Sequence, residues 1–291
     1  MRIGVTGGAG YIGSHVVCDL LAAGHEVTVL DNLVTGNRGN IFPETSSYRF
    51  IEGDSGSDEG LSRLFESRPE VIFHFAASKA AGESMTDPVK YSSNNIRGTY
   101  RLIEYMVERE CRNFIFSSSA AVYGEPQYLP IDEKHPLQPI NYYGYTKLNI
   151  EQNLAWFSKL KGVRYAALRY FNAVGYDIDG RINTIETTTA NLMPLVMEAA
   201  IGKRSEIQIF GRDYDTPDGT CLRDYIHVND LARAHVMAMD SIVKDDRDIV
   251  VNLGTGKDIS VLDMLESARK ITGRTIPSRD VARRTGDPPR L

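Results

Sequence analysis

The chain has 291 residues, of which 42% are hydrophobic and 24% charged, as in ordinary soluble globular proteins. This balance excludes a disordered or fibrous chain, and the net charge of -5 disfavours nucleic-acid binding. The sequence has no long apolar run and no secretory leader pattern, so we expect neither a membrane span nor secretion. Its three cysteines are widely spaced, which argues against a disulfide framework and for a cytoplasmic location.

Short apolar runs alternate with helix-length segments along the chain. We predict strands over residues 3–5, 27–30, 49–51, 71–75, 113–116 and 165–168. The helix-like segments include residues 14–23, 94–110 and 143–160. Parallel neighbouring strands need a connection longer than a hairpin turn. The alternation therefore predicts the α/β fold class, with a doubly wound parallel sheet.

The sequence pattern changes after residue 174. Residues 175–219 are rich in Asp, Asn, Thr and Gly, which predicts a smaller second lobe. We therefore assign residues 1–174 to a first domain and residues 175–291 to a smaller C-terminal lobe. Later helix-like and strand-like segments, at about residues 225–255, could return to the first domain.

A glycine-rich turn lies between the first expected strand and the helix-like run that follows it. Its glycines are Gly7, Gly10 and Gly13, with Tyr11 and Ile12 between the last two. Such a turn lets the backbone approach a pyrophosphate, and the helix N-terminus adds N–H donors and a favourable dipole. The turn predicts a dinucleotide site on a Rossmann sheet, and the alternative is a tight turn without a ligand.

The second expected strand ends at Asp31, eighteen residues beyond Gly13. A carboxylate at this place can accept hydrogen bonds from an adenosine ribose and repels a 2′-phosphate, so we expect NAD rather than NADP. Arg38 is the nearby residue that could accommodate a phosphate instead. Asp54 follows the third strand and is placed to meet the adenine, although a plain turn acid is an equal alternative.

Tyr143 and Lys147 lie four residues apart at the start of a helix-like stretch. This spacing puts both on one helical face, where the ammonium group can stabilise a phenolate. An exposed Tyr/Lys pair is the alternative. Three serines, Ser117, Ser118 and Ser119, follow the strand 113–116, at the strand end where open α/β sheets bind ligands. A hydroxyl there can share a proton with a substrate oxygen and with Tyr143.

With these motifs the whole chain resembles the extended short-chain dehydrogenase/reductase family, and within it the nucleotide-sugar 4-epimerases. The matching segments are residues 6–14, 31–33, 74–79, 94–95, 117–124, 143–147, 168–172, 191–194, 209–211, 223–228 and 283–288. The resemblance implies interconversion of UDP-glucose and UDP-galactose at C4. It also implies a transient 4-keto sugar and tightly bound NAD as cofactor.

The resemblance further implies roles for individual residues. Tyr143 is implied as the base, Lys147 as the residue that tunes it and holds the cofactor ribose, and Ser119 as the partner of the sugar O4. The other implied cofactor-binding residues are Gly7, Gly10, Tyr11, Ile12, Gly13, Asp31, Asn32, Asp54, Phe75, Ala76, Ala77, Lys79, Asn94, Ser117 and Tyr170. The UDP-sugar is implied to contact Lys79, Asn172, Asn191, Leu192, Ile209, Phe210, Arg223, Arg284 and Asp287, besides Ser119 and Tyr143. No histidine has metal-ligand spacing, so we expect no metal.

Other functions remain open at this point. The substrate could be UDP-GlcNAc and UDP-GalNAc or a UDP-pentose, although Leu291, at an implied gate position, favours the smaller hexoses. A 4,6-dehydratase would need an acid/base pair, and Ser119-Ala120-Ala121 offers no carboxylate. A non-catalytic dinucleotide-sensing regulator would not need Ser119, Tyr143 and Lys147 together. The resemblance also implies a homodimer, formed through helices such as residues 94–110 and 143–160.

Overall fold

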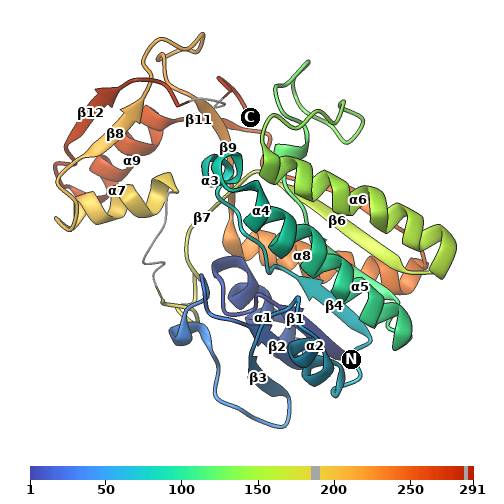
Figure 1. Cartoon of the computed structure of the whole chain (residues 1–291). Coiled ribbons are helices and arrows are strands. Elements are labelled where there is room, and N and C mark those ends of the chain that lie inside the picture. Colours follow the sequence, from blue (N-terminus) through green and yellow to red (C-terminus); the bar gives the residue numbers. More distant parts are fainter. Residues whose placement is uncertain (185–190, 285–287) are drawn as a thin grey trace.

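The computed structural model describes residues 1–184, 191–284 and 288–291. A parallel sheet of seven strands forms the main body (Figure 1), with the order β10-β6-β5-β4-β1-β2-β3. The strands are β1 (Arg2–Thr6), β2 (Glu26–Asp31), β3 (Tyr48–Glu52), β4 (Val71–His74), β5 (Asn113–Ser117), β6 (Arg164–Tyr170) and β10 (Ile249–Leu253). The strand order reverses beside β1, where such sheets bind ligands. The predicted doubly wound α/β fold class is confirmed.

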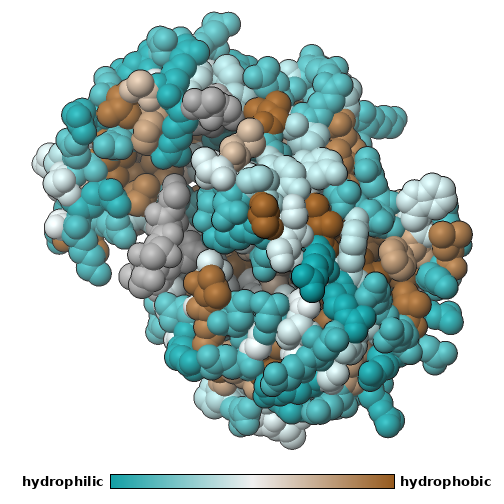
Figure 2. Space-filling view, viewed as in Figure 1, coloured by the Kyte–Doolittle hydropathy of each residue, from teal (hydrophilic) through white to brown (hydrophobic). Residues whose placement is uncertain are grey.

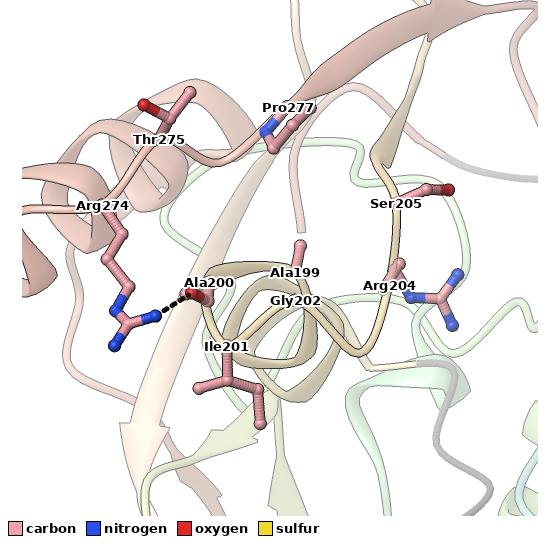
Figure 3. Close-up of a pocket in the computed structure, with 9 residues that line it drawn as sticks. All are labelled: Ala199, Ala200, Ile201, Gly202, Arg204, Ser205, Arg274, Thr275 and Pro277. Carbon is pink, nitrogen blue, oxygen red and sulfur yellow. Dashed lines mark hydrogen bonds between the residues drawn. The ribbon is translucent and has the colours of Figure 1, made fainter.

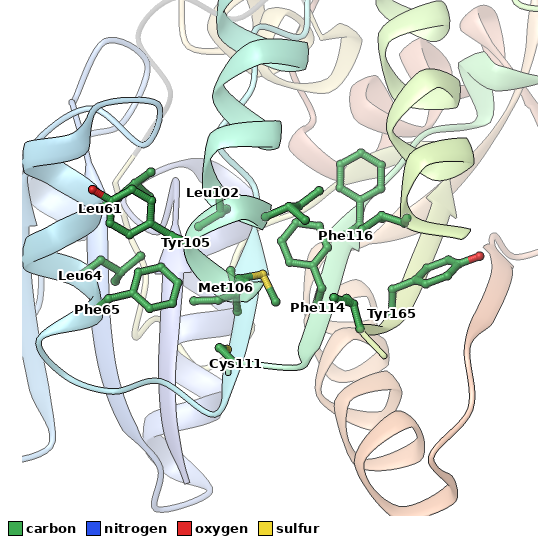
Figure 4. Close-up of a cluster of buried hydrophobic side chains, with 14 of the residues drawn as sticks. Leu61, Leu64, Phe65, Leu102, Tyr105, Met106, Cys111, Phe114, Phe116 and Tyr165 are labelled. Atoms are coloured by element: carbon green, nitrogen blue, oxygen red, sulfur yellow. The ribbon is translucent and has the colours of Figure 1, made fainter. Parts of the chain in front are cut away.

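Helices cover both faces of this sheet (Figure 1). They are α1 (Tyr11–Ala22) and α8 (Val228–Asp245) on one face, and α2 (Asp58–Phe65), α5 (Gly98–Glu108) and α6 (Tyr142–Lys161) on the other. Leu64 and Met106 belong to the cluster under α2, α5 and α6, which Figure 4 shows against aromatic side chains of β5. Val16 and Met239 belong to the cluster under α1 and α8. Two hydrophobic cores therefore fix the sheet between its helices.

A smaller lobe packs beside the strand ends (Figure 1, yellow to red). It holds α7 (Leu192–Ala200), α9 (Val261–Thr272), β8 (Ile207–Phe210) and β12 (Ser278–Val281), around a third hydrophobic cluster. A three-stranded sheet joins it to the main body through β7 (Asn172–Val174), β9 (Leu222–His227) and β11 (Asp258–Ser260). Between β9 and β11 the chain returns to the main body: α8 covers the main sheet, and β10 pairs with β6 at its edge.

Five shorter helical elements complete the described structure. They are η1 (Arg38–Asn40), α3 (Ala81–Thr86), α4 (Pro88–Tyr91), η2 (Ser92–Arg97) and η3 (Ala120–Val122). The segment 92–97 is a π-helix turn, so the helix expected at 94–110 is α-helical only from Gly98 to Glu108. Asn95 sits in this turn and bonds the Ser78 carbonyl and the Thr146 hydroxyl, and these contacts hold the widened turn in place.

The surface carries no continuous apolar face in the direction shown by Figure 2, where hydrophobic residues form separate small groups among hydrophilic ones. Among the described residues, no helix combines the length and the apolar character needed to cross a membrane. Cys18, Cys111 and Cys221 are all buried, and none of the three forms a disulfide in the part of the chain that the structure describes.

Candidate active site

A cavity of about 1320 Å³ opens between the carboxyl ends of the main-sheet strands and the small lobe. The structure brings most of the predicted site residues into its lining. They are Gly7, Gly10, Tyr11, Ile12, Gly13, Asp31, Asn32, Phe75, Ala76, Ala77, Lys79, Asn94, Ser117, Ser119, Tyr143, Lys147, Tyr170, Asn172, Asn191, Leu192, Phe210, Arg223 and Arg284. Below, this cavity is called the cleft.

The glycine turn forms a cradle in which the backbone has no room for side chains. Gly7 has a positive φ of 75°, and a Cβ there would lie 2.5 Å from the Ala76 amide nitrogen. A Cβ on Gly13 would collide with the Gly7 carbonyl oxygen. Helix α1 begins here with no side-chain cap at Gly10. The first turn of α1 therefore presents backbone N–H groups to the cleft, as a diphosphate requires.

Asp31 lies at the carboxyl end of β2 and is buried. Its carboxylate accepts hydrogen bonds from the amides of Ala9 at 2.9 Å and Leu33 at 2.8 Å. Burial raises the pKa of Asp31, and these two backbone bonds oppose the shift. Each oxygen has capacity for a further hydrogen bond and Asp31 lines the cleft, so the residue can accept the hydroxyls of a ribose.

Tyr143 and Lys147 are placed by the start of α6. The Asn141 side chain caps this helix by accepting from the Gly144 amide at 2.8 Å, and the Ser84 hydroxyl accepts from the Tyr143 amide at 3.0 Å. Burial raises the pKa of the Tyr143 phenol, and a hydrogen bond with Ser119 opposes this shift. The predicted serine and tyrosine are therefore direct partners.

Lys147 is almost fully buried, with 2% of its surface exposed. Its ammonium group donates to the Ser117 carbonyl at 2.7 Å and lies 5.8 Å from the centre of the Tyr143 ring. Burial lowers the pKa of Lys147 to about 7, while the Glu151 charge acts in the opposite direction. A cation in this position stabilises a phenolate on Tyr143.

Comparison with known proteins places these features in a family. Residues 3–254 match the family model described as NAD dependent epimerase/dehydratase family. The UDP-glucose 4-epimerase of Halalkalibacterium halodurans is 45% identical, over 100% of this chain and 86% of its own length. The chain belongs to the NAD-dependent epimerase/dehydratase family.

Solved structures of family members have the same fold. The UDP-glucose 4-epimerase from Brucella ovis in complex with NAD is 45% identical, with a TM-score of 0.94 over 100% of this chain and 88% of that one. The enzyme from Bifidobacterium longum in complex with NAD+ and UDP is 37% identical, with a TM-score of 0.91 over 100% and 89%. These two relatives were therefore solved with NAD, and with NAD+ and UDP, respectively.

Three residues implied by the resemblance do not join the described lining. Ile209 is 3% exposed and packs into the small-lobe core, whereas its immediate neighbours Gln208 and Phe210 line the cleft. Ile207 belongs to the same core and also reaches the lining. Asp54 instead accepts from the Asn32 side chain at 3.2 Å and the Gly56 amide at 2.6 Å. Asp287 lies outside the described residues.

The cleft also contains side chains that the sequence analysis did not select. They include Val34, Thr35, Ser78, Glu83, Lys90, Phe171, Val174, Met193, Leu195, Arg204, Glu206, Ile207, Gln208, Cys221, Tyr225 and Val261. Strand alternation from Phe210 would have identified Gln208, two residues before it. Glu83 and Lys90 form an ion pair at 2.6 Å, which no sequence motif predicts.

The cationic side chains of the small lobe differ in exposure. Arg223 is 9% exposed and donates to the Leu222 carbonyl at 2.7 Å. Arg284 is exposed and its guanidinium stacks on the Phe210 ring at 3.9 Å. Guanidinium groups pair bidentately with phosphate oxygens, so this wall suits a diphosphate.

A second cavity, of about 500 Å³, lies at the C-terminal end of α7 (Figure 3). It is lined by residues 199–202 with Arg204, Ser205, Arg274, Thr275 and Pro277. Arg274 donates to the Ala200 carbonyl there, at 3.5 Å. None of the residues predicted for the site lines this cavity. Within the described ranges, no cluster of three or more His, Cys, Asp or Glu side chains could hold a metal ion.

Proposed function

We propose that this chain interconverts UDP-glucose and UDP-galactose by inverting C4, with NAD as its cofactor. One observation carries the proposal: the cleft joins the Ser119, Tyr143 and Lys147 group to a small-lobe wall that carries Arg223 and Arg284. The first group suits proton transfer at a sugar hydroxyl, and the second suits a diphosphate.

The cradle at Gly7 and Gly13, the uncapped start of α1, and Asp31 fit NAD. When bound, this cofactor accepts a hydride from C4 and returns it, which makes inversion possible. Asp31 accepts the hydroxyls of the adenosine ribose, and Lys147 is close enough to Tyr143 to serve both the cofactor and the base. The carboxylate of Asp31 also disfavours a 2′-phosphate.

Tyr143 holds and moves the proton of the sugar O4. Its phenol shares a hydrogen bond with Ser119, whose hydroxyl can bond the same oxygen, and Lys147 stabilises the phenolate. Lys147 is buried, whereas Ser119 and Tyr143 are partly exposed in the cleft, so a sugar bound against them would exclude water from the proton transfer. Arg223 and Arg284 hold the diphosphate while the hexose presents first one face and then the other to the base.

A 4,6-dehydratase is less well supported than an epimerase. Water elimination needs an additional acid/base pair, and η3 presents Ala120 and Ala121 beside Ser119 rather than carboxylates. We also infer a cytoplasmic homodimer without nucleic-acid partners. Trp156 and Leu160 support the dimer, because α6 leaves them 60% and 70% exposed on one of the helices expected to pair.

The experiment is direct. The purified protein is denatured, the released nucleotide is identified by mass spectrometry, and conversion between UDP-glucose and UDP-galactose is followed in both directions. We expect NAD and an equilibrium mixture of the two sugars. Release of NADP would contradict the cofactor assignment, and a protein that holds NAD without converting either sugar would favour the regulator. Assays with UDP-GlcNAc and a UDP-pentose decide the preferred sugar.

A further inference from the structure

Ser118 faces away from the cleft, unlike the serines on either side of it. Ser117 and Ser119 line the cleft, whereas Ser118 is completely buried and is absent from the lining. The Ser118 hydroxyl donates to Oε1 of Glu151. Ser117 accepts from Lys147 and Ser119 bonds Tyr143. Ser118, which lies between them in the chain, therefore bonds a carboxylate outside the cleft.

Glu151 lies four residues after Lys147, one turn further along α6 and on the same helical face. Its carboxylate forms a buried ion pair with Arg169 of β6, at 2.6 Å from Nη2 and 3.0 Å from Nε. The pair is 5% and 6% exposed. One carboxylate thus joins the end of β5, the helix that carries Tyr143 and Lys147, and the neighbouring strand β6.

The network continues from Arg169 away from the cleft. Arg169 donates to the Tyr123 hydroxyl at 3.0 Å, and Tyr123 donates to Oδ1 of Asn252 at 2.6 Å. Glu151, Arg169 and Ser118 do not line the cleft, so none of them contacts a ligand there directly. Stability alone is a weak reason for such a pair, because well-packed apolar residues usually replace a buried ion pair without loss.

We propose that Glu151 is a positioning residue for the Ser119, Tyr143 and Lys147 group. Through Ser118 it fixes the backbone on which Ser119 faces Tyr143 and the Ser117 carbonyl faces Lys147. Through α6 its charge favours the ammonium form of Lys147. The inference rests on the proposed epimerase function, since it concerns the rate of that reaction.

The negative charge of Glu151 affects the protonation of Lys147, because the Lys147 ammonium group is buried. The titratable and charged groups around Lys147 are Tyr143 and Glu151 from α6, His74 from β4, and Arg169 and Tyr170 from β6. Burial lowers the pKa of Lys147, and Glu151 is the charge that raises it. Loss of Glu151 therefore lowers the pKa of Lys147 further, and the cation is lost at a lower pH.

Ser118→Ala tests the positioning contact without disturbing the ion pair. We expect kcat to fall by about tenfold, while KM for the UDP-sugar stays within about twofold, because small misplacements of reacting groups cost rate rather than binding. Ser67→Ala is the control, since it removes a hydrogen-bonded serine hydroxyl just after α2 that is partly buried and does not line the cleft. The control should retain wild-type kcat.

Glu151→Leu combined with Arg169→Met tests the charge. The double replacement leaves no unpaired buried charge, so the fold should survive. We expect kcat to stay at least about tenfold below wild type, with unchanged NAD content. The alkaline limb of the kcat profile should move to lower pH. Glu151→Asp, which keeps the charge, should leave that limb near its wild-type position.

The outcomes separate this inference from the proposed function. A wild-type protein without epimerase activity contradicts the function itself. An active wild type together with full kcat in Ser118→Ala overturns the positioning role. Wild-type kcat and an unmoved alkaline limb in the double variant would show that the pair is only structural. If the double variant does not fold, Ser118→Ala alone decides.

Discussion

The two walls of the cleft are built on different principles. The wall formed by the main sheet and α6, here the sheet wall, carries Ser119, Tyr143 and Lys147. The wall formed by the small lobe, here the lobe wall, carries Gln208, Phe210, Arg223 and Arg284. Lys147 is nearly inaccessible, whereas Gln208 and Arg284 are exposed.

This difference follows from what each wall must do. Proton transfer needs groups held in one geometry and away from water, which the buried contacts behind the sheet wall provide. Recognition of a diphosphate needs guanidinium donors, which the lobe wall supplies from the largely buried Arg223 and the exposed Arg284. Changes in the sheet wall should therefore act on rate, and changes in the lobe wall on binding.

The largest effect should come from Tyr143→Phe. This change removes only the hydroxyl that transfers the proton, so kcat should fall by at least about a hundredfold, the lower range for general acid–base groups. Bound NAD should remain, because the Gly7 cradle and Asp31 are untouched. Steady-state kinetics with nucleotide release after denaturation measure both quantities. Turnover above about a hundredth of the wild-type rate would exclude Tyr143 as the base.

The lobe wall should respond differently. Arg223→Met should raise KM for the UDP-sugar by about tenfold or more, since charge-assisted hydrogen bonds to phosphate are worth about 1.5–3 kcal/mol. Arg284→Met should have a smaller and more salt-dependent effect, because exposed charges are screened. Both should leave kcat within about twofold of wild type. Titration of initial rates at two salt concentrations tests the ranking, and a loss of kcat without a rise in KM would contradict the division between the walls.

The sequence alone was sufficient for the fold class and for the location of the cleft. Alternation of apolar runs predicted the parallel sheet, and the strand ending at Asp31 is confirmed. Residues that belong to local motifs, such as Gly7, Tyr143 and Lys147, could be selected from spacing because helices and turns impose fixed geometry. The structure brings these residues into one cleft.

Contacts between distant segments were beyond the sequence analysis. Glu151 and Arg169 are eighteen positions apart, on a helix and a strand whose packing no local pattern predicts. The π-helix turn at 92–97 was also missed, because it depends on the bonds of Asn95 to Ser78 and Thr146. The resemblance assigned Ile209 to the substrate without using the alternation of β8.

The buried His74 of β4, in the main sheet, should make the free energy of unfolding fall at acidic pH. Its Nδ1 lies 2.6 Å from the Thr6 hydroxyl and its Nε2 lies 2.7 Å from the Thr99 hydroxyl. The Thr99 hydroxyl donates to the Asn95 carbonyl, so His74 must donate from Nε2 and accept at Nδ1 as a neutral ring. Burial lowers the pKa of His74 to about 3.

The sign follows from proton uptake on unfolding. Between about pH 6.5 and pH 3 the unfolded chain binds a proton at His74 that the folded chain does not, so stability falls as the pH falls. From pH 8 to pH 5, His74 should account for a loss on the order of 2 kcal/mol in the free energy of unfolding. Urea unfolding of wild type and His74→Gln at both pH values gives the difference. An equal pH dependence in the two proteins would show that His74 is not held neutral.

The smallest effect should come from Ile209→Val, which tests the alternation of β8. Ile209 packs in the small-lobe core, while Gln208 and Phe210 face the cleft. Removing one methyl group from this core should lower the free energy of unfolding by about 1 kcal/mol. KM and kcat should not change, because the side chain does not line the cleft. Gln208→Ala is the matched change on the same strand. It should raise KM slightly and leave the free energy of unfolding almost unchanged. A rise in KM for Ile209→Val larger than that for Gln208→Ala would show that Ile209 contacts the substrate.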